Sequence, residues 1–345
     1  MSRRWPREKG VVMGVEVIEF GIVDTRVGRS AFAVCAGLAL LASLTGCNRV
    51  TLVSGVAPSS IAIGDTDVYF TTSSTLPNQL NRVPINGGAT STVATSYATM
   101  TSLVRFGSSM FWADISARDS DAGVWQVPLP SGTPTQVSHH GEDLISNQAL
   151  VVYATGSTAS DMVTHVLDGV PLVAKLFDTR LSASGSSEVS LLPDTDPTTY
   201  HNYYPFSLVL DAANVYFTHD GNEGVWRAPL SGGAATLLVS GVARATLAID
   251  GSTLFFQQGN DINQIAVTGG AVSTFAAGAG VVTAMVAHHG AVYWTCGTCG
   301  TVVKQAVGGT TSLTLASGEA NPRSIAVDDT HVYFGTSSGL VRIDD

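Results

Sequence analysis

The chain has 345 residues, of which 45% are hydrophobic and 13% charged, and it contains 36 glycines. A chain of this length can bury a large core, but its low charge does not suit a helical surface, so we expect strands and turns. The formal net charge of -10 argues against a function that needs clustered Lys and Arg, so no nucleic-acid partner is expected.

The first distinctive segment is an apolar run that follows Arg26 and Arg29 and ends at Cys47. This run, SAFAVCAGLALLASLTGC, has the length and small-residue end of a secretory signal peptide and is too short for a stable membrane anchor. Its last four residues, LTGC, resemble the lipobox of bacterial lipoproteins. The resemblance implies cleavage before Cys47, with palmitate-class acyl chains on that cysteine. Several such chains give lasting membrane attachment.

Residues 1–46 are therefore predicted to be a leader, in which residues 1–25 are either an extension or a wrongly assigned start. The alternative is a buried strand or helix that ends in an ordinary cysteine. No later stretch approaches the ~20 apolar residues of a transmembrane helix. Asn48 follows the cysteine, and by resemblance to the enterobacterial sorting rule this permits the outer membrane. The expected location is the bacterial cell envelope, on the periplasmic side of the outer membrane or at the cell surface.

Seven segments share one pattern, a short apolar strand, a polar turn and a strand with an aromatic or β-branched centre. Their second strands centre on Tyr69, Phe111, Val152, Tyr216, Phe255, Tyr293 and Tyr333. The centres are about 40 residues apart, except for one longer interval caused by extra residues at about 160–205. Most copies continue into a third strand and a Gly-Gly turn, which supplies the positive φ of a tight hairpin. Four strands per ~40 residues is the blade period of a β-propeller.

The two ends of the repeat region complement each other. The last copy stops after three strands, and residues 50–54 (VTLVS) precede the first complete copy. Pairing of 50–54 with 340–344 would supply the missing strand and hide two exposed sheet edges. We therefore predict an all-β fold over residues 47–345, a seven-bladed β-propeller with an N-terminal strand that closes the last blade.

The amino-acid sequences of the repeats also support this fold class. The segments YWT at 293–295 and FWAD at 111–114 resemble propeller families with such strands: the YWTD repeats of lipoprotein receptors, the NHL repeats and the streptogramin lyase group. The resemblance covers about residues 50–345 and implies architecture, not activity. The chain departs from the YWTD pattern, because Cys296 replaces its aspartate and because that family has six blades.

The segment HHGAVYWTCGTCGTV, at 288–302, invites a zinc or redox interpretation. At ~3.3 Å per residue, a regular strand would separate His289 from Cys296 by roughly 20 Å, whereas zinc binds its ligands at ~2.0–2.3 Å. These residues cannot share one ion. Cys296 and Cys299 are instead expected to form a disulfide, as in exported proteins, because the βαβ context of a redox C-x-x-C motif is absent. The sequence predicts neither a metal site nor a cofactor.

Alternating strands place the loops of a propeller on two faces. The face with second-to-third loops and blade links varies most, and irregular loops on a rigid scaffold commonly bind ligands. Its candidate binding residues are Asp114, Arg118, His139, His140, Glu142, Tyr200, His201, Tyr203, Tyr204, His219, Asp220 and Glu223. Polar loops that merely face water are the alternative, although Tyr-rich segments are enriched at interfaces.

The predicted function is a non-catalytic binding or scaffold module for a protein, peptide or glycan partner. The alternative is a periplasmic lyase or hydrolase with a His/Glu site in the central funnel. That site would draw on His139 or His140, Glu142, His201, His219 and Glu223. Streptogramin lyases and lactonase-like propellers resemble this plan, but no loop here carries their motifs. Fold class alone does not decide between these functions.

Overall fold

A computed structural model describes residues 48–72, 76–115, 123–138, 143–146, 150–154, 166–167, 170–171, 180–182, 205–219, 224–231 and 235–345. These residues all belong to one compact unit, and their regular secondary structure is β-strand. In this part of the chain no helix has the length and hydropathy of a membrane span.

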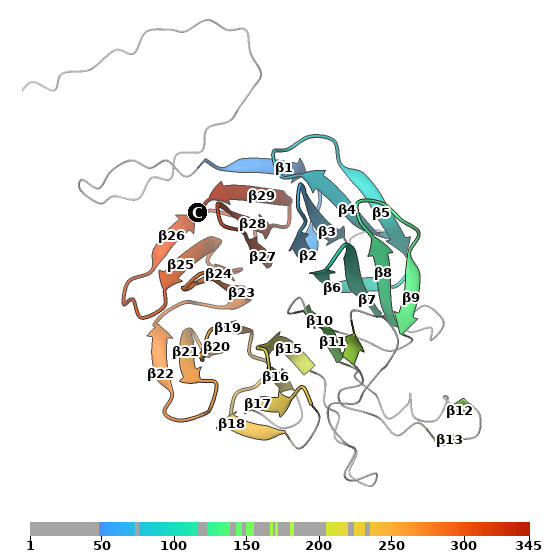
Figure 1. The fold of residues 1–345 in the computed structure, drawn as a ribbon. Coiled ribbons are helices and arrows are strands. Elements are labelled where there is room, and N and C mark those ends of the chain that lie inside the picture. Colours follow the sequence, from blue (N-terminus) through green and yellow to red (C-terminus); the bar gives the residue numbers. More distant parts are fainter. Residues whose placement is uncertain are drawn as a thin grey trace, which may run out of the picture. The chain divides into compact units, whose positions relative to one another are not determined.

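In the described residues, antiparallel strands form six four-stranded sheets (Figure 1). Five are built from hairpins in chain order, and the sixth takes its outer strand, β1, from before the first blade. The first contains β2 (Pro58–Ile63), β3 (Asp67–Thr72), β4 (Asn78–Pro84) and β5 (Ser91–Ser96). The second contains β6 (Thr99–Phe106), β7 (Ser109–Ile115), β8 (Gly123–Pro128) and β9 (Thr135–Ser138). Next come β15 (Pro205–Leu210), β16 (Asn214–His219), β17 (Gly224–Pro229) and β18 (Thr236–Ser240).

The fourth sheet contains β19 (Leu247–Asp250), β20 (Thr253–Gln258), β21 (Asp261–Ala266) and β22 (Ser273–Ala276). The fifth contains β23 (Val282–His288), β24 (Ala291–Cys296), β25 (Thr301–Ala306) and β26 (Leu313–Ala316). The sixth contains β27 (Ser324–Val327), β28 (His331–Gly335), β29 (Gly339–Asp344) and β1 (Val50–Ser54). A three-stranded sheet contains β10 (Asp143–Ser146), β11 (Leu150–Ala154) and β14 (Arg180–Ser182), and a hairpin joins β12 (Val166–Leu167) to β13 (Val170–Pro171).

The first strands of the sheets contact one another in chain order around a ring. β2 contacts β6, β6 contacts β10, and the succession continues through β15, β19 and β23 to β27, which returns to β2. Figure 1 shows these strands innermost, with the later strands of each sheet farther out. This arrangement is a β-propeller, as the repeat predicted.

The predicted number of seven blades is wrong, because the described part of the chain forms six four-stranded blades. The third predicted copy, centred on Val152, forms only the three-stranded sheet β10–β11–β14 among the described residues. Its third strand does not follow β11 directly but comes from Arg180–Ser182. The extra residues in this region therefore interrupt the succession of local hairpins that builds the other blades.

The N-terminal strand β1 completes the last blade by pairing with β29. The register joins Val50 to Arg342 and Ser54 to Gly339, with an irregularity between Thr51 and Val53. This pairing is the one expected from residues 50–54 and the C-terminal strand. It covers the backbone edge of β29, which would otherwise be open to pairing with another chain.

Most of the buried clusters join side chains from two neighbouring blades. One buried cluster, for example, joins Tyr69 and Leu80 of the first blade to Leu103 and Trp112 of the second. Each blade is a small sheet with apolar side chains on both faces, so it buries them by stacking against its two neighbours. The ring therefore depends on the cooperation of adjacent blades.

Glycine pairs form the turns between the third and fourth strands of two blades, as the sequence indicated. Gly87 and Gly88 have φ values of 84° and 141°, and Gly269 and Gly270 have 92° and 129°. Residues with a Cβ rarely adopt these values, so these turns require glycine at both positions, as the Gly-Gly pairs in the sequence indicated.

Candidate functional site

The loop face is defined here by the loops between second and third strands and by the links between blades. Its described members include residues 76–77, 97–98, 277–281, 297–300 and 317–323. The turn face, at the other end of the inner strands, is defined by the turns between first and second strands.

Four inner strands contain a register irregularity close to their loop-face end, where the strand begins. The irregularities lie between Pro58 and Ser60, Thr101 and Leu103, Pro205 and Ser207, and Val282 and Ala284. In two blades the extra residue bonds to the second strand through its hydroxyl: Ser59 Oγ lies 2.9 Å from Thr71 Oγ1, and Thr283 Oγ1 lies 2.8 Å from Thr295 Oγ1. Such bulges redirect side chains and are over-represented beside functional sites.

Hydroxyl groups near these bulges also form hydrogen bonds across four blade boundaries. The bonds run from Leu103 N–H to Ser60 Oγ (2.9 Å), from Leu247 N–H to Ser207 Oγ (3.1 Å), from Thr283 Oγ1 to Pro322 O (2.6 Å) and from Ser324 Oγ to Pro58 O (3.2 Å). Because these bonds cross blade boundaries, they fix the inner strands relative to one another at the loop face.

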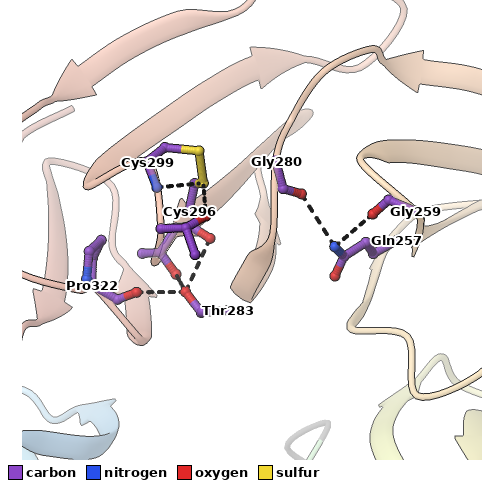
Figure 2. The surroundings of a disulfide bond; sticks show 9 residues. Gln257, Gly259, Gly280, Thr283, Cys296, Cys299 and Pro322 are labelled. Atoms are coloured by element: carbon purple, nitrogen blue, oxygen red, sulfur yellow. Dashed lines mark hydrogen bonds between the residues drawn. A yellow bond between two sulfur atoms is a disulfide. The ribbon is translucent and has the colours of Figure 1, made fainter.

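A disulfide joins Cys296, the last residue of β24, to Cys299 in the loop that follows (Figure 2). The two Cα atoms are 5.2 Å apart, and the Cys299 N–H donates a hydrogen bond to Cys296 Sγ at 3.1 Å. Gly280 in the preceding blade link packs against this bridge, since a Cβ added there would lie 2.5 and 2.7 Å from the two sulfur atoms. The predicted disulfide therefore fixes a loop and a link of the loop face at one point.

Only two of the twelve predicted binding residues fall within the described part of the chain. Asp114 lies in β7 opposite Gly123, and its side chain is buried, with 2% exposed. It is therefore part of the blade end rather than an exposed contact. His219 is the last residue of β16, where its backbone pairs with Pro205.

The other predicted binding residues lie outside the described residues. They are Arg118, His139, His140, Glu142, Tyr200, His201, Tyr203, Tyr204, Asp220 and Glu223. The predicted acylation site, Cys47, also lies outside them, immediately before Asn48.

Exposed apolar side chains mark part of the loop face. Tyr97 is 78% exposed and Leu76 is 69% exposed. Their segments are joined by a hydrogen bond from Asn78 Nδ2 to Ala98 O, 2.6 Å long and buried. The two side chains therefore project from a fixed junction between the β3–β4 loop and the link from β5 to β6. Val281, in the link before β23, is 48% exposed on the same face.

Two turns of the turn face share an Asp–Tyr motif. Asp211 Oδ1 accepts hydrogen bonds from the N–H groups of Ala213 and Asn214, both at 2.7 Å, and its Oδ2 accepts one from the Tyr216 hydroxyl at 2.7 Å. Burial alone would raise the pKa of this carboxyl. The bonds from Tyr216 and the two N–H groups stabilise the charged form, and the pKa lies below its ordinary value.

Asp328 repeats the motif in the last blade. It accepts from the N–H groups of Thr330 and His331, both at 2.8 Å, and from the Tyr333 hydroxyl at 2.8 Å. The carboxylate thus closes the turn and orients the buried tyrosine of the next strand at the same time.

Next to this second motif, His288, His289 and Asp329 form the group of potential metal ligands found within the described residues. Their ligand atoms lie within 4.8 Å of one another. His288 Nε2 is 3.0 Å and His289 Nδ1 is 3.2 Å from Asp329 Oδ1, and the two imidazole rings stack at 4.0 Å.

Sequence reasoning missed this group because it tested the histidines only against the nearby cysteines. β24 separates them, with the histidines before Ala291 on the turn face and Cys296 at the loop face. The signal that could have found the group is positional, since HHG and DDT occupy equivalent turns of consecutive repeats, and neighbouring blades bring such turns together.

No family profile matches the chain, and no curated protein sequence is significantly similar to it. Solved structures do share its fold. The virginiamycin B lyase of Staphylococcus aureus has a TM-score of 0.63 at 13% identity, over 87% of this chain and 99% of the lyase. BamB from Moraxella catarrhalis has a TM-score of 0.51 at 11% identity, over 88% of this chain and 98% of BamB. A computationally designed protein, Ika8, has a TM-score of 0.57 at 12% identity, over 85% of this chain and 99% of Ika8.

These similarities establish the architecture. All three identities are low, so the shared feature is the propeller fold and not a common activity. The fold is used by a lyase, by BamB and by a designed protein alike. Function has to be inferred from the surface of this chain.

Proposed function

We propose that the protein is a non-catalytic binding or scaffold module of the bacterial cell envelope, which holds a protein, peptide or glycan partner on its loop face. The main support is the exposure of Leu76 (69%) and Tyr97 (78%) on that face. Their segments are held together by the hydrogen bond from Asn78 to Ala98. A tyrosine loses little side-chain entropy on binding and offers a large contact area, so an exposed one on a rigid scaffold suits recognition.

The rigidity of the loop face supports the same proposal. Hydroxyl bonds between blades and the Cys296–Cys299 disulfide hold the ends of the inner strands in place. A surface that is already ordered before binding pays less conformational entropy when a partner docks.

The proposed anchor is an acylated Cys47. The LTGC motif supports it. The structure of the residues that follow sets how near the anchor the ring would lie. Arg49 makes a two-pronged ion pair with Glu319, with N–O distances of 2.8 and 3.0 Å, and β1 begins at Val50. The blade ring would therefore lie only a few residues from the membrane-bound cysteine, within the cell envelope on the periplasmic side of the outer membrane or at the cell surface.

The binding proposal is tested by photo-crosslinking in cells. A benzophenone amino acid placed at position 97 is expected to give one crosslinked product of defined mass. The matched control is the same probe at position 313, because Leu313 is 60% exposed but lies on the outer strand β26. The Leu76→Ser change should weaken the product at 97. Identical products from both positions, or none from position 97, would contradict the proposal.

The anchor is tested by metabolic labelling with an alkyne fatty acid. The full chain should be labelled and should partition into detergent, and Cys47→Ser should abolish both. Cys35→Ser is the matched control, because Cys35 lies in the same apolar run but outside the LTGC motif. Labelling that survives in Cys47→Ser would refute acylation at this site and leave the binding proposal to its own test.

A further inference from the structure

The turn face carries three metal-ligating side chains on two neighbouring blades. His288 is the last residue of β23, and His289 begins the two-residue turn to β24. Asp329 lies in the turn between β27 and β28 of the next blade. Its Oδ1 is 3.0 Å from His288 Nε2 and 3.2 Å from His289 Nδ1. One carboxylate therefore meets two imidazoles across a blade boundary.

The backbone of the turn makes this convergence possible. Side chains of consecutive strand residues point to opposite sides of a sheet, so adjacent histidines do not ordinarily face one group. His289 has a φ of 45° and Gly290 a φ of 76°, as in a type I′ hairpin turn. Asn or Gly adopts the first position of such a turn with less strain than His. With His in this conformation, its ring stacks on that of His288 at 4.0 Å.

The chemistry of the three groups, and the spacing between Asp329 and each histidine, match a borderline divalent metal ion. Zinc binds imidazole nitrogen and carboxylate oxygen at ~2.0–2.2 Å, so ligand atoms at ~90–110° around the ion lie roughly 2.9–3.4 Å apart. The distances from Asp329 Oδ1 to the two ring nitrogens, 3.0 and 3.2 Å, fall in this interval, and all three ligand atoms lie within 4.8 Å of one another. The side chains of His289 and Asp329 are 74% and 75% exposed, so an ion can enter and take a further ligand from water or a partner.

The neighbouring charged groups have other partners. Asp328 Oδ1 accepts the turn N–H groups of Thr330 and His331. His331 Nδ1 lies 2.7 Å from Thr330 Oγ1. Asp328 and His331 are therefore engaged in the hydrogen bonds of the turn itself, and the proposed site consists of His288, His289 and Asp329.

We propose that His288, His289 and Asp329 form a surface site for a divalent transition-metal ion of the Zn²⁺ class. The ion would join the β23–β26 blade to the last blade on the turn face. The proposal departs from the expectation of no metal, and it is independent of the proposed partner, which would dock on the opposite face.

The test uses the full chain without a polyhistidine tag, stripped of metal by a chelator and titrated with Zn²⁺ by calorimetry. His289→Asn and Asp329→Asn are each expected to remove one equivalent of bound Zn²⁺. His331→Asn is the matched control, because His331 is the first residue of β28, directly after the same turn. The double change His139→Asn/His140→Asn controls for the other adjacent histidine pair. Both controls should leave the site at His289 and Asp329 intact.

Thermal unfolding gives a second readout. Binding to the folded state should raise Tm by about 5 °C at ~100-fold excess of Zn²⁺ over Kd, reversibly with EDTA. In EDTA, His289→Asn should unfold at or above the wild-type Tm, because Asn tolerates the left-handed turn better; this also shows that the variant folds. Unchanged Zn²⁺ stoichiometry in both site variants, or no Zn²⁺-dependent rise in Tm, would overturn the proposal and leave only hydrogen bonds at Asp329.

Discussion

At the scale of single residues, the Asp–Tyr motif shows how one carboxylate organises a turn and a strand. Asp211 holds two backbone N–H groups with one oxygen and the hydroxyl of the fully buried Tyr216 with the other. The corresponding position of the next blade is Phe255, whose ring is also fully buried. An aromatic ring without a hydroxyl therefore packs at this position of a blade. The Tyr216 hydroxyl is needed only for its hydrogen bond to Asp211.

Tyr216→Phe isolates that hydrogen bond. The ring can remain packed as Phe255 does, but Asp211 loses a donor, so the free energy of unfolding is expected to fall by about 1–2 kcal/mol. Urea denaturation measures the change. Tyr97→Phe is the control, because Tyr97 is largely exposed and its change should be close to zero. Equal effects at the two positions would contradict the role of the hydroxyl.

Asp211→Asn tests the charge of the same group. The lowered pKa means that the ionised carboxylate stabilises the fold above its ordinary pKa of about 4, and that this stability is lost as the pH falls through the folded-state pKa. Wild type should therefore be more stable than the variant at about pH 6, and the difference should narrow towards about pH 3. Urea denaturation across this range measures it, and a constant difference would show that the charge contributes nothing.

At the scale of elements, the disulfide loop and the blade link before β23 act together. Gly278 and Gly280 of this link have φ values of 68° and 76°. A Cβ at Gly278 meets nothing within 4 Å, whereas at Gly280 it overlaps both sulfur atoms of the Cys296–Cys299 bridge. The two glycines therefore face the same backbone requirement but differ in packing.

Gly278→Ala and Gly280→Ala separate these two effects. Gly278→Ala should cost about 1 kcal/mol through its left-handed backbone. Gly280→Ala should cost roughly 1–3 kcal/mol more, because the added methyl displaces the bridge. The measurement is chemical denaturation under oxidising conditions. Similar costs for both variants would mean that the link does not pack on the disulfide.

Elements were also what the sequence predicted best. The seven centres from Tyr69 to Tyr333 all lie in second strands of sheets. Short apolar runs bounded by turn residues predict strands from local sequence alone, so these positions could be found without knowledge of the tertiary structure. The predicted number of blades was wrong because the extra residues at about 160–205 interrupt the ~40-residue repeat. A count of repeat copies also does not show whether each copy forms a four-stranded sheet.

The sites were harder to predict than the fold. Loops have no periodicity, so the exposure of Leu76 and Tyr97 had no signal in the sequence beyond their residue types. The group around Asp329 joins side chains 41 residues apart, in two different repeats. Only the lateral packing of blades brings them together. The disulfide, in contrast, closes over three residues and could be predicted from local spacing and the expected compartment.

At the scale of the whole molecule, the closed ring depends on the junction between β1 and β29. Leu52 of β1 is 8% exposed and belongs to a buried cluster that includes Ile61 and Phe70 of the first blade and Leu340 of β29. The Arg342 guanidinium donates a hydrogen bond to Ile85 O at 2.7 Å, which adds a polar contact across the same boundary. One short strand thus joins the last blade to the first.

Leu52→Ala should loosen this junction. Removing a buried leucine side chain costs about 2–4 kcal/mol, and here it should also favour association through the edge of β29. Ser54→Ala, at an exposed position of the same strand, should change stability by less than about 0.5 kcal/mol. Denaturation and light scattering are the measurements. A monomeric Leu52→Ala variant with wild-type stability would show that the ring does not rely on β1.

The pairing of β1 with β29 also dictates when folding can finish. β1 is synthesised before every other strand of the ring, and its partner β29 (Gly339–Asp344) is synthesised after them. The ring therefore cannot close before the last blade has been synthesised, and contacts so distant in sequence form slowly. Until β29 has been made, β1 has no partner in the ring, and its backbone edge stays open to pairing with other strands.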